Sequence, residues 1–278
     1  EKLASIVREN NPPIVNQLNQ GDLEKLVQQL SKTGKFSSEQ LELFPQLLGL
    51  IYREKLDRAT FKNWLYEIQW KPLNISQSHQ IFQPSHWLIF ADSTGLGQTL
   101  KTQLQHQGHE CSLVYRADTY QHSETGIYYI NPEQPQEFEQ LYQAIETSKL
   151  PLKKIIHLWS LDATGEQNLT VSALETAQLW GCGSVLHWLQ AVVKNPKTSL
   201  PQLWLITRGS QPVLNTEKIA VTQSSLWGLG RVISWEHPHL WGGLVDLDPQ
   251  GSQQEAERLL QLVIDSQKQD HLALRGEQ

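Results

Sequence analysis

From about Trp64 onward, short apolar runs with strand character alternate with longer helical patterns, and this alternation constrains the fold more than any other feature. Strands separated by helices of this length need crossover connections, so they pair in parallel and both faces of the sheet become covered. The sequence therefore predicts an α/β fold with a doubly wound, Rossmann-like parallel sheet, preceded by an all-helical segment.

The hydrophobic periodicity places the individual elements. The predicted strands are Trp64–Trp70, His86–Ala91, Cys111–Tyr115, Ile127–Ile130, Lys154–Leu158, Leu203–Thr207 and Gly243–Leu247. The predicted helices are Leu96–Gln105, Gln136–Glu146, Ser172–Val193, Ser224–Trp235 and Gln253–Asp265. Ser172 and Glu175 are spaced as a capping box, which predicts the start of the longest helix.

Residues 1–60 are helical in pattern and contain no convincing strand, so we expect one segment at 1–60 and a second at 61–278. Short helices of this kind need a partner surface, because propensity alone does not hold them. Two interpretations remain open: a cap on the following domain, or a helical self-association module. In the second case the interface would be an apolar stripe of Leu23, Leu26, Leu30, Phe44, Leu47 and Ile51.

Charge and cysteine content exclude several classes of partner. The formal net charge is -6 and no basic block stands out, so we expect no nucleic acid partner. Cys111 and Cys182 form no C-x-x-C pair, which favours a reducing, cytoplasmic setting.

No apolar run has the length of a signal peptide core or a membrane span. The chain has no methionine, so we expect it to be a piece of something larger.

The turn after the strand His86–Ala91 is the candidate phosphate-binding site. A dinucleotide-binding fold places glycines here so that backbone amides approach a pyrophosphate at a helix N-terminus. Gly95 and Gly97 are present, the earlier glycines are absent, and Asp92 puts a carboxylate near the phosphate position. We therefore interpret the turn as vestigial, a tight strand-to-helix connection. Arg116 could meet a 2′-phosphate or be a solvated surface residue.

Catalytic residues are equally scarce, and we predict none. A short-chain reductase needs a tyrosine with a lysine four residues later, and this spacing is absent at Tyr52, Tyr66, Tyr115, Tyr120, Tyr128, Tyr129 and Tyr142. Ser160 and Thr207 follow strands, where isolated hydroxyls usually form turns. The pairs His106/His109 and His237/His239 lack further ligands, so we predict no metal site.

Four stretches of the chain resemble one known family. Ser225–Pro249 (SLWGLGRVISWEHPHLWGGLVDLDP) closely resembles the ketoreductase regions of modular type I polyketide synthases. So do Ile155–Ala163, Leu203–Val213 and the closing HLALRG of 271–276. The resemblance covers about residues 64–278.

The resemblance implies a role for each segment. In that family, a structural subdomain that has lost its cofactor site precedes a catalytic subdomain that carries NADPH. This chain resembles the structural half, a truncated short-chain-reductase fold, and residues 1–60 resemble a dimerisation element. We accordingly expect no cofactor in this chain, a homodimer, and a catalytic ketoreductase subdomain and other synthase domains as partners. The alternatives are a reductase part that still binds nucleotide, and a dimerisation module whose Rossmann domain is a spacer.

Overall fold

The computed structural model divides the chain into two compact units, Glu1–Gln69 and Trp70–Gln278. The residues that the structure describes are 37, 43, 68–73, 83–123, 125–163, 169–195, 200–214, 218–265 and 269–276. All the elements given below belong to the second unit. None of the helices within these ranges is both long enough and apolar enough to cross a membrane.

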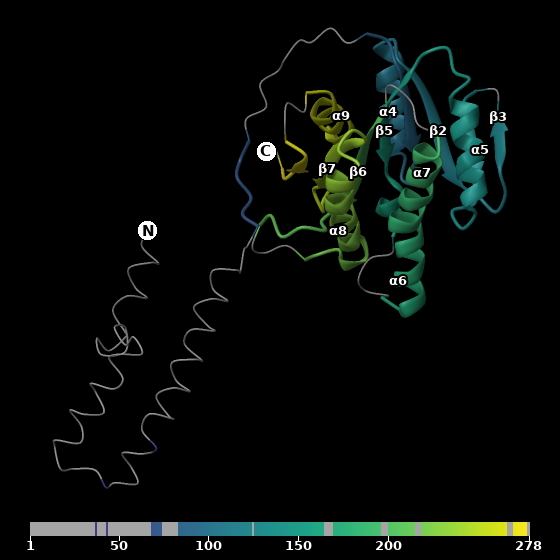
Figure 1. The fold of residues 1–278 in the computed structure, drawn as a ribbon. Coiled ribbons are helices and arrows are strands. Elements are labelled where there is room, and N and C mark those ends of the chain that lie inside the picture. The colour runs from purple at the N-terminus through teal and green to yellow at the C-terminus, as the bar shows by residue number, and fades with distance from the viewer. Residues whose placement is uncertain are drawn as a thin grey trace, which may run out of the picture. The chain divides into compact units, whose positions relative to one another are not determined.

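An eight-stranded sheet forms the centre of the second unit, with the strand order β3-β4-β2-β1-β5-β6-β7-β8 (Figure 1). Its strands are β1 His86–Phe90, β2 Glu110–Arg116, β3 Gln121–Ser123, β4 Ile127–Ile130, β5 Leu152–His157, β6 Gln202–Arg208, β7 Trp241–Leu247 and β8 His271–Ala273. Neighbouring strands pair in parallel, except that β3 runs antiparallel to β4 at one edge. The predicted Rossmann-like sheet is thus confirmed.

Helices cover both faces of this sheet. They are α4 Leu96–His106, α5 Pro135–Ile145, α6 Val171–Gln178, α7 Ser184–Val193, α8 Val221–Glu236 and α9 Glu255–Asp265, with a 3₁₀ turn η1 at Trp159–Asp162 and a π-helix η3 at Leu179–Gly183. Helices α5, α7 and α8 pack on one face of the sheet, and α4 and α9 pack on the other.

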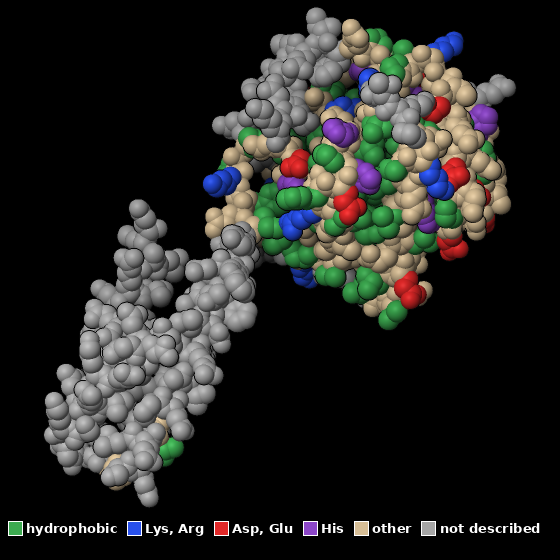
Figure 2. Space-filling model, viewed as in Figure 1, with side chains coloured by type: hydrophobic (Ala, Val, Ile, Leu, Met, Phe, Trp, Pro, Cys, Tyr) green, Lys and Arg blue, Asp and Glu red, His purple; other side chains and the backbone are tan. Residues whose placement is uncertain are grey.

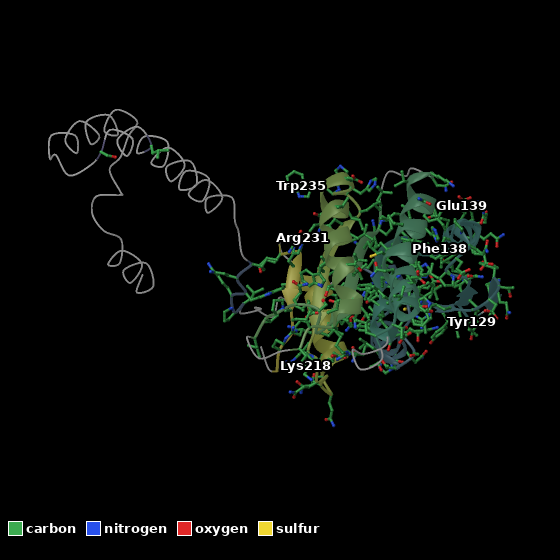
Figure 3. All side chains as sticks on the ribbon, turned by 90° about the horizontal axis from the view of Figure 1, so that it is seen from below. Tyr129, Phe138, Glu139, Lys218, Arg231 and Trp235 are labelled. Carbon is green, nitrogen blue, oxygen red and sulfur yellow. The ribbon has the colours of Figure 1, made fainter. Side chains whose placement is uncertain are left out.

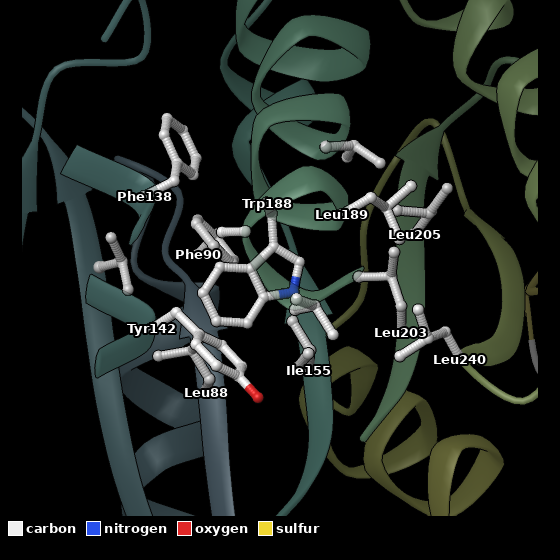
Figure 4. Packing of buried hydrophobic residues seen from close by; sticks show 14 of the residues in the cluster. Leu88, Phe90, Phe138, Tyr142, Ile155, Trp188, Leu189, Leu203, Leu205 and Leu240 are labelled. Carbon is white, nitrogen blue, oxygen red and sulfur yellow. The ribbon is translucent and has the colours of Figure 1, made fainter. Parts of the chain in front are cut away.

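Strand β1 shows why the buried strands read as continuous apolar runs. Leu88 and Phe90 point into the core beneath α5, α7 and α8, whereas Trp87 and Ile89 point into the core beneath α4 and α9. Side chains alternate between the two faces, and a sheet covered on both sides needs apolar residues at every position. Figure 4 shows the first core, where Trp188 of α7 lies among side chains from β1, α5 and β5.

The predicted helical region Ser172–Val193 is present as α6, η3 and α7 in direct succession, but its predicted cap is wrong. The π-helix η3 separates α6 from α7, and it contains Gly181 and Gly183. The N-cap of α6 is Thr170, whose side-chain oxygen accepts a hydrogen bond from the Ala173 backbone N–H at 3.1 Å. Thr170 has the extended backbone that an N-cap requires, whereas Ser172 already lies inside the first turn.

Short edge elements account for the remaining differences. Of the predicted strand Trp64–Trp70, the structure describes only Ile68–Trp70, and these residues form no strand, so the prediction is wrong for them. Strands β3 and β8 were not predicted, because three residues are too few to establish an alternating pattern. The other predicted elements are present, with ends shifted by up to three residues.

Candidate functional site

The carboxyl ends of β1, β2 and β5 define the place where a Rossmann fold binds its ligand. In the strand order, the chain moves from β1 to β2 on one side and later to β5 on the other. Open α/β sheets bind ligands in the crevice outside such a switch point. The residues that surround it here are the turn from β1 to α4, the end of β2, and η1 after β5.

Asp92 occupies the turn between β1 and α4 and is only 2% exposed. Its carboxylate accepts backbone N–H groups from Thr94 at 3.0 Å, Leu96 at 3.2 Å and Gly97 at 2.8 Å. The Thr94 hydroxyl donates a further hydrogen bond to the same carboxylate. The amides at this helix N-terminus, where dinucleotide-binding folds hold a phosphate, thus donate to an anion from within the chain.

The two glycines of the turn have separate structural roles. Gly95 is the N-cap of α4 and has a φ of 100°, in the left-handed region that glycine adopts without strain. At Gly97, a Cβ atom would lie 2.9 Å from the Cβ of Ala91. Gly97 therefore lets α4 approach the end of β1 closely. These contacts match the interpretation of the turn as a tight strand-to-helix connection.

Arg116 ends β2 and is held in contacts within the protein. Its guanidinium forms an ion pair with Asp162, whose side chain is 4% exposed. The same guanidinium lies over the Trp180 ring, 4.1 Å from the ring centroid. Asp162 also accepts the Ser93 backbone N–H at 2.9 Å and the Ser93 hydroxyl at 2.7 Å. Arg116 is therefore not a solvated surface residue: its side chain is 18% exposed and joins β2, η1 and the β1 turn.

The two candidate hydroxyls after β5 and β6 are also buried and bonded. The Ser160 hydroxyl donates to the backbone carbonyl of Ile206. The Thr207 hydroxyl donates to the carboxylate of Asp246 at 2.7 Å and accepts the indole N–H of Trp227 at 2.9 Å. Both hydroxyls therefore connect neighbouring elements.

The Thr207 hydroxyl belongs to a buried polar cluster around Asp246 that the sequence did not reveal. Asp246 of β7 is fully buried, and its carboxylate accepts the Ser210 N–H at 2.9 Å and the Ser210 hydroxyl at 2.8 Å. Arg275 pairs with this carboxylate at 2.7 Å and also donates to the Gln211 carbonyl at 3.1 Å. Asp246 and Arg275 are 29 residues apart, so no local spacing signalled the pair. The one signal in the sequence was that both residues lie in stretches that resemble the ketoreductase regions.

Four of the five described tyrosines are poorly suited to proton donation. Burial raises the pKa of the Tyr115, Tyr120, Tyr128 and Tyr142 phenols. A reductase tyrosine needs the opposite shift, because its phenolate must form readily near neutral pH. Tyr52 and Tyr66 lie outside the described residues.

The histidines serve packing and hydrogen bonding. His157 of β5 is fully buried, its Nε2 lies 2.8 Å from the Ser184 hydroxyl, and burial lowers its pKa to about 3. His109 bonds through Nδ1 to the Ser85 hydroxyl at 3.2 Å, and burial lowers its pKa as well. Across the ranges that the structure describes, His106, His237 and His239 belong to no cluster of three or more potential metal ligands.

An apolar groove lies between α7 and α8, away from the switch point. It contains a cavity of about 280 Å³ lined by Leu186, Leu189, Val193, Leu229, Val232 and Ile233 together with polar residues at its rim. A second cavity of about 200 Å³ shares Val193, Glu236 and His237 with the first. Figure 2 shows hydrophobic side chains gathered over this face. Trp235 of α8 is 87% exposed and points away from the helix (Figure 3).

The candidate interface of the first unit cannot be placed in the same way. Leu23, Leu26, Leu30, Phe44, Leu47 and Ile51 lie outside the residues that the structure describes.

Comparisons with known proteins place this geometry in a family. Residues 85–265 match the family described as "Beta-ketoacyl synthase-like, N-terminal". Polyketide synthase GfsA of Streptomyces halstedii is 24% identical over 227 residues, 80% of this chain and 3% of that protein. A phenolphthiocerol/phthiocerol polyketide synthase of Mycobacterium tuberculosis is 40% identical over 60 residues, 21% of this chain and 4% of that protein. The chain thus spans only a few per cent of these relatives.

Solved structures share the fold. A ketoreductase-containing module of a keto acid-selecting NRPS superposes with a TM-score of 0.67 and 21% identity, covering 74% of this chain and 17% of that chain. A C2-type ketoreductase from a modular polyketide synthase gives 0.53 and 20%, covering 70% and 39%. The chain therefore belongs to the beta-ketoacyl synthase-like, N-terminal family, and its relatives and fold confirm the resemblance to the ketoreductase region of modular polyketide synthases.

Proposed function

We propose that this chain is a non-catalytic structural subdomain of a polyketide synthase ketoreductase region. One observation carries the proposal: the Asp92 carboxylate accepts the N–H groups at the start of α4 that would otherwise bind a phosphate. This turn lies at the switch point of the sheet, where a cofactor-binding subdomain would need an open crevice.

The electrostatic energies at the β1–α4 turn favour a turn without a bound phosphate. A phosphate placed about 4 Å from an ionised Asp92 would meet a repulsion on the order of 4 kcal/mol at an effective dielectric constant of 20. The helix N-terminus offers an anion only about 0.3–1 kcal/mol, or up to about 2 kcal/mol when partly buried. The repulsion exceeds the attraction. The Arg116–Asp162 ion pair lies beside this turn, because Asp162 also accepts the Ser93 backbone N–H and hydroxyl.

In this proposal, a partner domain catalyses the reduction. A catalytic ketoreductase subdomain would carry NADPH and reduce a β-ketoacyl chain tethered to an acyl carrier protein, in the cytoplasm. The apolar groove between α7 and α8 supports a packing role, because exposed apolar patches of this kind mark protein interfaces. Residues 1–60 would assist dimerisation of the module.

Calorimetric titration with NADPH tests the proposal. We expect no measurable binding to the unmutated chain below millimolar concentrations. Asp92→Gly alone should restore little binding, because the turn still lacks the other glycines of a phosphate loop. A micromolar dissociation constant for the unmutated chain would contradict the proposal and favour the alternative, a reductase part that retains nucleotide binding.

An activity assay provides a second test. The chain alone should not oxidise NADPH with a β-ketoacyl thioester, because it lacks a tyrosine and lysine in the required spacing. General acid–base catalysis by such a pair contributes a factor of about 10²–10⁴ to the rate. Turnover above a protein-free blank that one substitution in this chain abolishes would overturn the proposal.

A further inference from the structure

A serine hydroxyl binds the carbonyls of the π-helix η3, which separates α6 from α7. η3 spans Leu179–Gly183, and Ser184 begins α7. Ser184 is fully buried, and its hydroxyl donates to the carbonyl of Trp180 at 2.6 Å and to that of Gly181 at 3.1 Å. A π turn interrupts the regular ladder of helical hydrogen bonds, so this hydroxyl supplies a donor where the ladder is broken.

His157 of β5 fixes the orientation of this hydroxyl. Its Nε2 lies 2.8 Å from Oγ of Ser184. Because the hydroxyl hydrogen of Ser184 points to the carbonyls of η3, the histidine nitrogen is the donor, and Nε2 carries the proton. Nδ1 then carries the lone pair, and it has no hydrogen-bond partner among the described residues. Buried N–H groups without an acceptor are rare, which agrees with this tautomer.

η3 in turn places Trp180 against Arg116 of β2. The guanidinium carbon of Arg116 lies 4.1 Å from the centroid of the Trp180 ring, a stacked cation–π contact. Arg116 forms its ion pair with Asp162 of η1. Asp162 accepts the backbone N–H of Ser93 at 2.9 Å, in the turn between β1 and α4. A continuous series of contacts therefore leads from η3 to this turn.

We propose that η3 is a conformational latch, in which Ser184 restrains the β1–α4 turn through Trp180 and Arg116. Without the Ser184 hydroxyl, the carbonyls of η3 lose a donor and the Trp180 ring loses its fixed position. Arg116 then holds Asp162 less firmly, and the bond from Ser93 opens more often. The inference rests on the proposed function, in which this turn is held by internal bonds and binds no cofactor.

Two backbone N–H groups of the turn distinguish the latch from a general loosening of the protein. The Ser93 N–H donates to Asp162, which belongs to the latch. The Gly97 N–H donates to Asp92 at 2.8 Å, a bond within the turn itself. Release of the latch should therefore increase solvent exchange at Ser93 and leave Gly97 protected.

Ser234 of α8 provides a matched control for Ser184. Its hydroxyl donates to the carbonyl of Arg231 at 2.8 Å, the same kind of serine-to-carbonyl bond. This bond lies in the continuous helix α8 rather than in a π turn. Ser234→Ala therefore removes an equivalent bond outside the latch, and it should change exchange neither at Ser93 nor at Gly97.

The experiment measures amide exchange with solvent at single residues by NMR, on the full chain and without nucleotide. In Ser184→Ala, exchange at Ser93 should rise about fivefold and exchange at Gly97 should stay within about a factor of two, because a local opening affects only the bonds that depend on it. Trp180→Leu, which removes the ring from Arg116, should give the same rise at Ser93.

A double variant shows whether Ser184 acts through Arg116. Arg116→Gln removes the ion pair with Asp162 and should itself raise exchange at Ser93. Adding Ser184→Ala should then give no further rise, because residues in one network are not additive. Effects that multiply, an unchanged Ser93 in Ser184→Ala, or an equal rise at Gly97 would overturn the proposal. NADPH titration is a separate measurement, so the latch and the proposed function can fail independently.

Discussion

At the scale of single residues, aspartates close the carboxyl edge of the sheet. Asp92 is bound by the start of α4, Asp162 by Arg116, and Asp246 by Arg275, and all three carboxylates are buried. A buried carboxylate is stable only when hydrogen bonds and counter-charges replace the water that it loses. At the switch point, Asp92 and Asp162 therefore hold the β1 turn, β2 and η1 together by internal bonds.

Asp92 should be important for stability. Asp92→Ala leaves the N–H groups of Thr94, Leu96 and Gly97 without their acceptor, and we expect a loss of about 2–4 kcal/mol in the free energy of unfolding, since bonds to charged groups are the strong ones. Asp92→Asn keeps an acceptor oxygen and should lose about half as much. Urea unfolding measures both variants. A loss below about 0.5 kcal/mol for Asp92→Ala would show that the turn does not depend on this carboxylate.

His157 should make the fold sensitive to mild acid. Burial lowers its pKa to about 3 in the folded state, whereas an unfolded histidine titrates near 6.5. Between these values the unfolded chain binds the proton and the folded chain does not, so stability falls as the pH falls from about 6.5 toward 3. The slope from this residue is about 1.4 kcal/mol per pH unit.

The comparison variant is His157→Asn, which does not titrate. Between pH 6 and 4.5 its free energy of unfolding should fall less steeply than that of the unmutated protein. His86 and His109, whose pKa values burial also lowers, remain in both proteins and do not affect the difference. Parallel pH profiles would show that His157 is not buried in its neutral form.

At the scale of elements, the packing of α4 on β1 depends on Gly97. A Cβ at Gly97 would come within 2.9 Å of the Ala91 Cβ and 3.1 Å of its Cα, so Gly97→Ala forces the helix away from the strand. We expect a loss of about 1–3 kcal/mol in unfolding free energy, the usual cost of overpacking. Thermal or urea unfolding measures the loss.

Gly228 in α8 is the matched control. A Cβ there would meet no heavy atom within 4 Å, so Gly228→Ala changes only the helix propensity. That change should stabilise the protein by about 0.5–1 kcal/mol. If both alanine variants have the same effect, close helix–strand contact is not the reason for glycine at position 97.

At the scale of the whole molecule, self-association is expected to depend on residues 1–60. A two-fold interface would use the same apolar stripe on both partners, with Leu23, Leu26, Leu30, Phe44, Leu47 and Ile51 as its members. Light scattering should give a dimer for the intact chain and a monomer for a chain that starts near Thr60. A monomeric intact chain, or a dimer that survives truncation, would contradict this prediction.

The sequence located the strands and helices of the core well, because a sheet buried on both faces imposes apolar runs that local pattern reveals. It misplaced the start of α6, where Thr170 and Ser172 are equally suitable residues and only the backbone conformation distinguishes them. It missed β3 and β8, since a three-residue edge strand is stabilised by pairing with its neighbour more than by its own composition.

The candidate site shows the same division. Sequence alone determined that the phosphate turn lacks its early glycines and carries Asp92, because these are facts of residue identity. Only the tertiary structure decided what the polar residues do. Arg116 meets Asp162 from 46 residues away, and Asp246 meets Arg275 from 29 residues away, because parallel crossovers bring distant strand ends to one edge. Local periodicity follows from the backbone geometry of each element, whereas these pairings depend on the order of strands in the sheet, which no local pattern encodes.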